Sequence, residues 1–265
     1  MGIEKLNQAF QTVLEKGDKA FVPYIMAGDG GLEKLNEQID FFEENGATAL
    51  ELGIPFSDPV ADGPTIQEAG IRALKAGTTL RAVLERLKLS KSTRSIPIVI
   101  MTYMNPIYVF GIKEFARVCE QAGVDGVIIP DLPMEEEEIL ADSLKDHQIA
   151  LIRLAALTSS KERVKEIASG TQGFLYAVTV TGITGARASY SENIGSYLKE
   201  LKEISSAPVL AGFGVSTPEH VVELGQYCDG VVVGSKIIEL LQKNDRDSIK
   251  KLIDAAKKTS LILKN

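Results

Sequence analysis

Two carboxylates stand eleven residues apart in the segment ELGIPFSDPVADGP, residues 51–64. The residues before it predict a short strand over 49–52, in which Glu51 points to the opposite face from its two leucine neighbours. We therefore expect Glu51 to lie in an interior, where a carboxylate must be paired, protonated through a raised pKa, or retained for function. Asp62 lies in the Pro-, Gly- and Asp-rich loop that follows, so the two residues are candidates for acid–base chemistry.

Glycine-rich segments follow three later predicted strands. GFG at 212–214 and GS at 234–235 occupy the ends of the last two, where barrel enzymes commonly bind phosphate with loop backbone and the N-terminus of a short helix. Ser235 could add a hydroxyl donor. GITGAR at 182–187 suits a lid with backbone donors. The alternative, that these glycines form only tight turns, stays open.

The elements that must position these residues are short β-branched runs alternating with longer amphipathic patterns, which is typical of βα units. Eight such runs match the number that closes a parallel (β/α)8 TIM barrel, with its active site at the C-terminal strand ends. The rival fold, an open doubly wound sheet, usually has Gly-x-Gly-x-x-Gly after its first strand, and FVPYIMAGDGG lacks this motif. The predicted strands are Phe21–Ile25, Ala49–Leu52, Ile98–Met101, Gly126–Ile129, Ala150–Leu154, Gly173–Val178, Pro208–Ala211 and Gly230–Val233.

Two further helices are predicted outside this alternation. Residues 3–16 should form an added helix that closes the barrel bottom, and Thr79–Leu89 should form another. No Pro- or Ser-rich linker divides the chain, so we expect residues 1–265 to be a single TIM-barrel domain.

The composition excludes several function classes. The chain has 265 residues, a net charge of −7 and no clustered Lys/Arg stripe, which argues against a nucleic-acid partner. No apolar run approaches membrane-spanning length, and the N-terminal residues lack the apolar core of a signal peptide. Cys119 and Cys228 lie far apart, so free thiols in a reducing cytoplasm are expected. The two histidines, His147 and His220, form no cluster with metal-ligand spacing, and no metal site is expected.

Other polar and aromatic residues have two interpretations. The acids from Glu135 to Glu138 are best explained as the solvated first turn of a helix. Asp131 fits equally well as a site residue or as a turn former. Tyr103, Tyr176 and Phe213 could be pocket walls or core.

Seven motifs together resemble one family, the tryptophan synthase alpha chain, over essentially the whole length. They are FVPYIMAGD, ELGIPFSDPVADGPTIQ, PIVIMTYMNP, IIPDLP, TGITGAR, AGFGVS and VVVGS, each at a predicted strand end. The resemblance implies a retro-aldol cleavage of indole-3-glycerol phosphate to indole and glyceraldehyde 3-phosphate. Glu51 would be the general acid/base, and Asp62 would accept from the indole N–H and stabilise the charge on the indolenine.

The resemblance also implies substrate contacts in two groups. The phosphate group would be held at the glycine-rich turns, and the indole between aromatic and aliphatic walls. Tyr24 stands where the family often has Phe, and Met26 where a smaller residue is frequent. The implied substrate-binding residues are Tyr24, Met101, Tyr103, Ile128, Tyr176, Thr184, Gly185, Gly212, Phe213, Gly214, Gly234 and Ser235.

The resemblance implies a partner as well. A pyridoxal-phosphate-dependent beta chain would receive the indole in an alpha2beta2 assembly, and the loops 55–64 and 182–187 would face it. No cofactor is expected in this chain. The alternatives are a free-standing indole-releasing lyase, a non-catalytic activator of the beta chain, and a barrel isomerase or aldolase of another pathway.

Overall fold

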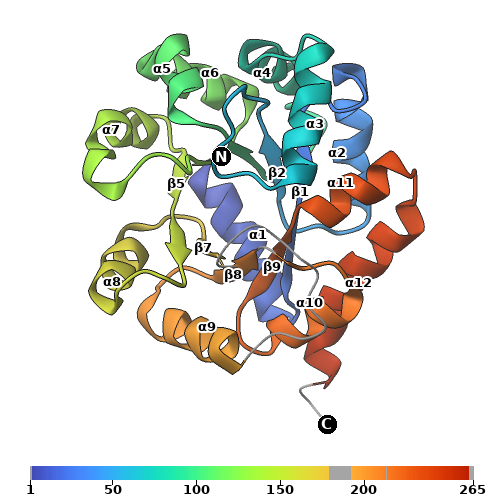
Figure 1. Ribbon diagram of the computed structural model, residues 1–265, viewed down its shortest axis with the longest axis vertical. Helices are drawn as coiled ribbons and strands as arrows, with labels where there is room; N and C mark the ends of the chain where they lie inside the picture. The colour runs from blue at the N-terminus through green and yellow to red at the C-terminus, as the bar shows by residue number, and fades with distance from the viewer. Residues whose placement is uncertain (1, 179–191, 213, 263–265) are drawn as a thin grey trace.

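Buried strands alternate with amphipathic helices in the computed structural model, which describes residues 2–178, 192–212 and 214–262 (Figure 1). All strand pairs are parallel. The strands are β1 Ala20–Met26, β2 Leu50–Gly53, β3 Ile98–Met101, β4 Gly126–Ile128, β5 Ala150–Ile152, β6 Leu154–Ala156, β7 Leu175–Val178, β8 Val209–Gly212 and β9 Gly230–Val233. The TIM-barrel prediction is confirmed.

Most of the helices form an outer ring around these strands, as Figure 1 shows. This arrangement covers the outer face of a parallel sheet, whose strands are buried on both faces. The helices are α1 Ile3–Glu15, α2 Leu35–Glu44, α3 Pro64–Lys75, α4 Leu80–Leu89, α5 Met104–Phe110, α6 Ile112–Ala122, α7 Glu138–Asp146, α8 Lys161–Gly170, α9 Glu192–Ile204, α10 Pro218–Gly225, α11 Ser235–Gln242 and α12 Arg246–Ile262, with short 3-10 turns η1 Leu32–Lys34 and η2 Met134–Glu136.

The sheet runs in the order β5-β4-β3-β2-β1-β9-β8-β7-β6, so its two ends are adjacent in the sequence. The prediction of one continuous strand over Ala150–Leu154 is wrong, because the segment is divided at Arg153 into β5 and β6. The Arg153 N–H donates to Thr171 Oγ1 at 3.1 Å, and its carbonyl accepts from Tyr176 N at 3.0 Å. One bent strand therefore pairs with β4 in its first half and with β7 in its second.

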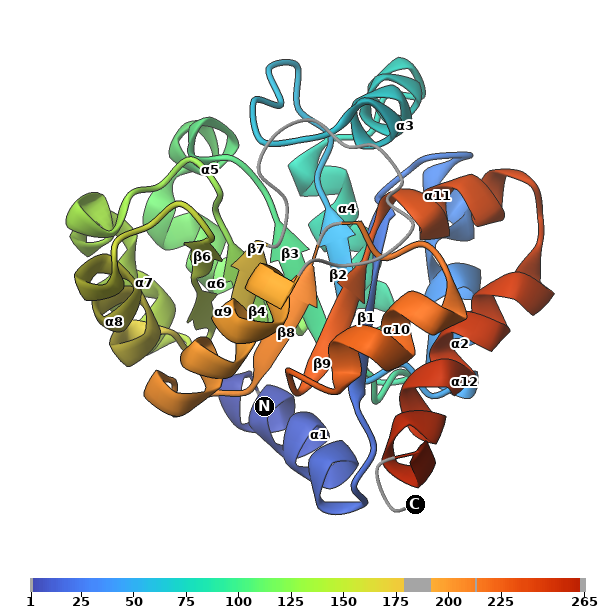
Figure 2. The same ribbon diagram turned by 60° about the horizontal axis from the view of Figure 1, so that its bottom comes forward.

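Helix α1 lies across the N-terminal ends of the strands, as predicted (Figure 2). Its buried residues Leu6 and Phe10 face the barrel, and the Phe10 ring lies 5.3 Å from Phe174. A Cβ at Gly173 would fall 2.5 Å from a Leu6 methyl carbon, so glycine leaves room for this side chain. The bottom of the barrel is thus filled by apolar side chains.

The connection from β2 to β3 contains α3 and α4, and their roles differ from the prediction. The segment Thr79–Leu89 does form a helix, α4, capped by Thr79 Oγ1 accepting from Ala82 N at 3.2 Å. Its buried leucines belong to the main core, however, so α4 is a member of the outer ring. The added helix is α3, which lies beyond the C-terminal strand ends beside α11 (Figure 2).

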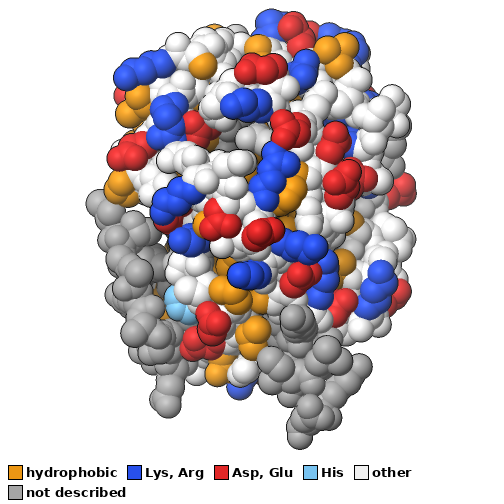
Figure 3. Space-filling view, turned by 90° about the vertical axis from the view of Figure 1, so that its right-hand side faces the viewer, with side chains coloured by type: hydrophobic (Ala, Val, Ile, Leu, Met, Phe, Trp, Pro, Cys, Tyr) orange, Lys and Arg blue, Asp and Glu red, His pale blue; other side chains and the backbone are white. Residues whose placement is uncertain are grey.

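The charge distribution on the surface and the lengths of the helices agree with the expectations from the composition. Basic and acidic side chains are interspersed over the face drawn in Figure 3, without a stripe of one sign. No helix in the described part of the chain is both long and apolar enough to cross a bilayer.

Candidate active site

Glu51 is fully buried in β2, inside the mouth of the barrel. Neither of its carboxylate oxygens has a hydrogen-bond partner among the described residues. Burial first, and the neighbouring Asp62 charge second, raise the pKa of Glu51 to about 8. At neutral pH this carboxyl group holds its proton, which is the state a general acid requires.

Asp62 lies in the loop between β2 and α3. Burial raises its pKa to about 6, and a hydrogen bond with the Tyr103 side chain opposes that rise. The Tyr103 hydroxyl also accepts from Ala61 N at 3.0 Å, and its ring lies 5.2 Å from Phe56. Tyr103 thus attaches the loop to the start of α5. At neutral pH Asp62 is mostly ionised while Glu51 is protonated, and such a separation suits two different roles.

Two further tyrosines enter the same space because glycines stand opposite them. Tyr24 on β1 pairs in register with Glu51, and a Cβ at Gly53 would fall 2.0 Å from its hydroxyl oxygen. On the other side of the mouth, a Cβ at Gly212 would fall 2.2 Å from Tyr176 Cε1. Burial, and then the two carboxylates, raise the pKa values of both phenols well above their usual range. Both tyrosines therefore remain hydrogen-bond donors.

The aliphatic residues predicted for the indole wall are adjacent. Met101 at the end of β3 pairs in register with Ile128 on β4, and the two belong to the apolar cluster of the barrel interior that also includes Tyr176. Met101 packs against the cluster of Tyr24 as well. These residues form a continuous apolar surface between the tyrosines.

The predicted phosphate residues lie at the ends of β8 and β9. Gly214 has φ of 81°, a backbone conformation that favours glycine. Gly234 precedes α11, and a Cβ there would lie 3.6 Å from both Ile66 Cδ1 and Tyr24 Cβ, an ordinary contact. Ser235 is the first residue of α11, so the unpaired N–H groups and the dipole of that helix face the same space. The predicted residues Thr184, Gly185 and Phe213 lie outside the described residues.

Some acidic residues that the sequence left with two interpretations, as site residues or as structural residues, have structural partners. Asp131 Oδ1 accepts from Met104 N at 2.9 Å and so holds the start of α5. Glu135 and Glu137 form ion pairs with Arg163 and Arg153, so they are more than a solvated first turn. No group of His, Cys, Asp and Glu that could hold a metal ion occurs within the described ranges.

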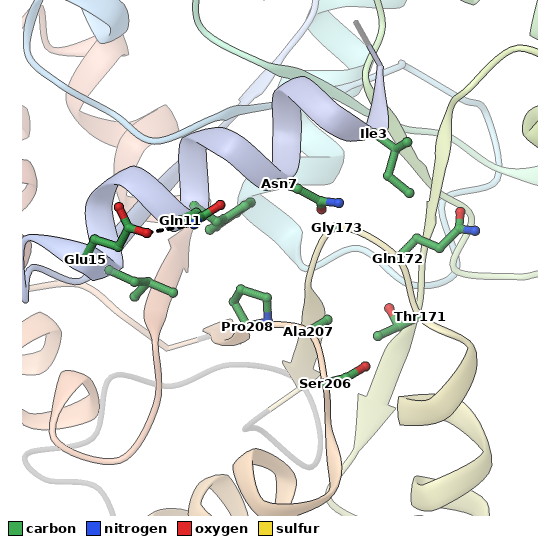
Figure 4. Close-up of a pocket in the computed structure, with 12 residues that line it drawn as sticks. Ile3, Asn7, Gln11, Glu15, Thr171, Gln172, Gly173, Ser206, Ala207 and Pro208 are labelled. Carbon is green, nitrogen blue, oxygen red and sulfur yellow. Dashed lines mark hydrogen bonds between the residues drawn. The ribbon is translucent and has the colours of Figure 1, made fainter.

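A cavity of about 680 Å³ lies at the opposite end of the barrel, between α1 and the turns before β7 and β8 (Figure 4). Gln11 Nε2 donates to Glu15 Oε1 there at 2.7 Å. The cavity contains none of the predicted site residues. The candidate catalytic residues therefore lie away from this cavity, at the C-terminal ends of the strands.

The sequence interpretation missed three features of the site. Phe56 stacks near Tyr103, Ile66 lies beside Gly234, and Arg72 forms an ion pair with Asp29 at 2.7 Å. Phe56 lies within a motif already identified, whereas the ion pair joins residues 43 positions apart and leaves no local pattern.

Comparisons with known proteins identify the family and the fold of this chain. The model of the family described as tryptophan synthase alpha chain matches residues 10–264. The chain is 57% identical over 253 residues to the tryptophan synthase alpha chain of Oceanobacillus iheyensis, covering 96% of this chain and 97% of that protein. A structure of Mycobacterium tuberculosis tryptophan synthase has a TM-score of 0.88 at 30% identity, covering 95% of this chain and 98% of that one. The alpha chain from Legionella pneumophila has a TM-score of 0.87, also at 30% identity, covering 97% and 98%.

Proposed function

Because this chain belongs to the tryptophan synthase alpha chain family, we propose that Glu51 and Asp62 perform its lyase reaction within one pocket. The chain catalyses the alpha-subunit step of tryptophan biosynthesis, the cleavage of indole-3-glycerol phosphate to indole and glyceraldehyde 3-phosphate. The observation that supports these roles best is the Glu51 carboxyl group, which is fully buried, has no hydrogen-bond partner among the described residues, and has a pKa raised to about 8.

Glu51 is the acid and then the base of the cycle. It gives its proton to C3 of the indole ring, which makes the ring an electron acceptor. The resulting carboxylate takes the proton of the neighbouring glycerol hydroxyl. The bond between C3 and the glycerol carbon then breaks, its electrons return to the ring, and the hydroxyl becomes the aldehyde carbonyl. One proton is given and one taken, so the residue ends the cycle protonated.

Asp62 stabilises the positive charge that protonation creates. Its carboxylate accepts from the indole N–H, and that hydrogen bond strengthens as the nitrogen becomes cationic. Tyr103 holds Asp62 through its hydrogen bond. Tyr24, Tyr176, Met101 and Ile128 surround the ring.

The phosphate group binds at the other end of the substrate. Gly234 and Ser235 supply backbone N–H groups and a hydroxyl at the N-terminus of α11, a site suited to an anion, and Gly214 supplies a backbone N–H group in the turn after β8. Gly185 and Gly212, with Phe213 in the same wall, would complete this side as the family resemblance implies. The resemblance also implies that Thr184 interacts with Asp62.

A beta chain is the proposed partner, and pyridoxal phosphate belongs to that chain. Val60, Tyr108 and Val109 are between 67% and 83% exposed, and they lie on the loop after β2 and on α5. Tyr103 immediately precedes α5 and contacts Asp62, so this surface is directly connected to the site. We propose an alpha2beta2 assembly in the cytoplasm, with residues 1–265 as one domain.

The test is release of indole and glyceraldehyde 3-phosphate from indole-3-glycerol phosphate, with and without a tryptophan synthase beta chain. Slow release that rises with the beta chain supports the coupled function, fast release without it indicates a free-standing lyase, and no release refutes the proposed catalytic roles. The double variant Tyr108→Lys/Val109→Asp should keep the rate of the isolated chain and lose the response to the beta chain. An unchanged response would refute the proposed surface.

A further inference from the structure

Arg72, on the added helix α3, joins three segments that are distant in the sequence. Its Nε and Nη2 atoms donate to the two carboxylate oxygens of Asp29 at 2.7 and 2.8 Å, in the bidentate geometry that makes such pairs strong. The Gln242 side-chain amide, turned so that its oxygen faces Arg72, accepts from Nη1 at 3.3 Å. Asp29 follows β1, and Gln242 is the last residue of α11. We call these three residues the Arg72 clamp.

The two helices joined by the clamp each carry one half of the proposed site at their other end. Helix α3 begins at Pro64, just after Asp62, and Gln67 Nε2 donates to the Asp62 carbonyl at 2.8 Å. Helix α11 begins at Ser235. The clamp lies near the C-terminal ends of both helices, so most of a helix separates it from each functional group.

The two helices contact each other at several points between their N-terminal ends and the clamp. Near their N-terminal ends, a Cβ at Gly234 would lie 3.6 Å from Ile66 Cδ1. Along their middle, Ala69 and Ala73 of α3 share an apolar cluster with Ile238 of α11. Figures 1 and 2 both show the two helices side by side at the mouth of the barrel. Fixing one end of such a pair restricts the other end, because helices are stiff on this scale.

The outer end of the pair combines apolar packing with the clamp, since Leu240 of α11 is buried in the main core and Leu241 packs against it. A cavity of about 360 Å³ adjoins the clamp and is lined by Asp29 and Gln242, by apolar residues that include Leu241, and by charged residues that include Glu37 and Arg246. Asp29 is only 16% exposed in its side chain, so its charge is partly removed from water and depends on Arg72. The clamp therefore adds a directional polar contact to the packing at this end.

We propose that Arg72 is a positioning residue that sets the separation between Asp62 and the Gly234–Ser235 turn. The inference rests on the proposed function, in which these groups bind the indole and phosphate ends of one substrate. A ligand that reaches both ends gains affinity only if the two half-sites are held at the right separation. A ligand that touches one end gains nothing from it.

The experiment compares one linked ligand with its two fragments. The linked ligand is an indole joined through a three-carbon chain to a phosphate, and the fragments are indole and glycerol 3-phosphate. The chain contains no Trp, so indole fluorescence reports binding without a background from tryptophan. Binding of glycerol 3-phosphate is measured by calorimetry.

In Arg72→Met the dissociation constant of the linked ligand should rise about five- to tenfold, while those of both fragments stay unchanged. Asp29→Asn should produce the same change, and the double variant no more than either single one, because all three remove the same pair. Arg72→Lys keeps the positive charge but loses the bidentate geometry, so it should raise the dissociation constant of the linked ligand by an intermediate amount. The matched control is Arg163→Met, which breaks the bidentate pair with Glu135 on the other side of the barrel and should leave all three affinities unchanged.

Two outcomes overturn the inference. Equal binding of the linked ligand by Arg72→Met and by the wild type would show that the clamp does not set the separation. Parallel weakening of the linked ligand and both fragments would show general damage to the fold. Failure of the proposed function is distinguishable, because the wild-type protein itself would then bind the linked ligand no more tightly than the fragments, and the clamp would lose its role with it.

Discussion

Replacing Glu51 by Gln should stabilise the fold while it removes at least about a hundredfold of turnover, the contribution of a general acid/base. Gln has the shape of a protonated Glu, so the variant keeps the packing of the buried side chain. It differs in having no proton to lose. As the pH rises, the wild-type protein loses stability because its folded state retains this proton, whereas the variant has no such loss.

The magnitude follows from the pKa of Glu51, which is about 8 in the folded protein and 4.5 in a solvated chain. Below pH 4.5 the carboxyl is protonated in both states, and the two proteins should be equally stable. As the pH rises from 4.5 to 8, the unfolded chain releases the proton and the folded one retains it, so the wild type loses stability. At about 1.36 kcal/mol per pH unit, the loss is about 3 kcal/mol at pH 7 and about 5 kcal/mol at pH 9.

Urea unfolding of both proteins at pH 5, 7 and 9 measures this difference directly. The advantage of the variant should be below about 1 kcal/mol at pH 5 and should grow with pH to the values above. Glu44→Gln, on the exposed end of α2, is the control and should show no such growth. A stability difference that is independent of pH, or a variant less stable than wild type at pH 9, would refute the assignment of a raised pKa to Glu51.

Three further substitutions test the rest of the site. Asp62→Asn should remove most activity, and it should lower the pKa of Glu51 because the Asp62 charge is one of its causes; the pH dependence of unfolding of this variant checks the shift. Ser235→Ala should weaken the affinity for glycerol 3-phosphate by about 0.5–1.5 kcal/mol and leave that for indole unchanged, as calorimetry can measure. Gly53→Ala should displace Tyr24, because the added Cβ would fall 2.0 Å from its hydroxyl oxygen. The cost of such overpacking is about 1–3 kcal/mol in a denaturant titration, and an unchanged indole affinity would contradict the placement of Tyr24 in the pocket.

Local sequence patterns predicted the strands well because most are short apolar runs bounded by glycine or polar residues. They failed at Arg153, since a polar residue in a short apolar run does not reveal that its backbone pairs with different neighbours on its two sides. They also placed Thr79–Leu89 outside the ring. Its apolar positions indicate a buried face, but only the packing shows that α4 buries this face in the main core, whereas α3 packs against α11 and β1.

The residues of the candidate site likewise include some that local sequence patterns predict and some that they do not. Glu51 could be predicted because strand alternation fixes the direction of a side chain relative to its neighbours. The convergence of Tyr24, Tyr103 and Tyr176 depends on the register of three strand ends, and the Arg72 clamp depends on a contact between distant segments. Neither has a periodic signature in the chain.

The apolar closure of the barrel by α1 has a consequence for the order of events. Leu6 and Phe10 leave the rim at the C-terminal strand ends as the route to Glu51 through the described residues. In the described part of the barrel, substrate and products therefore use the same end, and a second substrate reaches Glu51 only after the products of the first have left. A protein bound over this rim would receive the product that leaves the site. Product release is therefore directed to one recipient only when such a protein is bound.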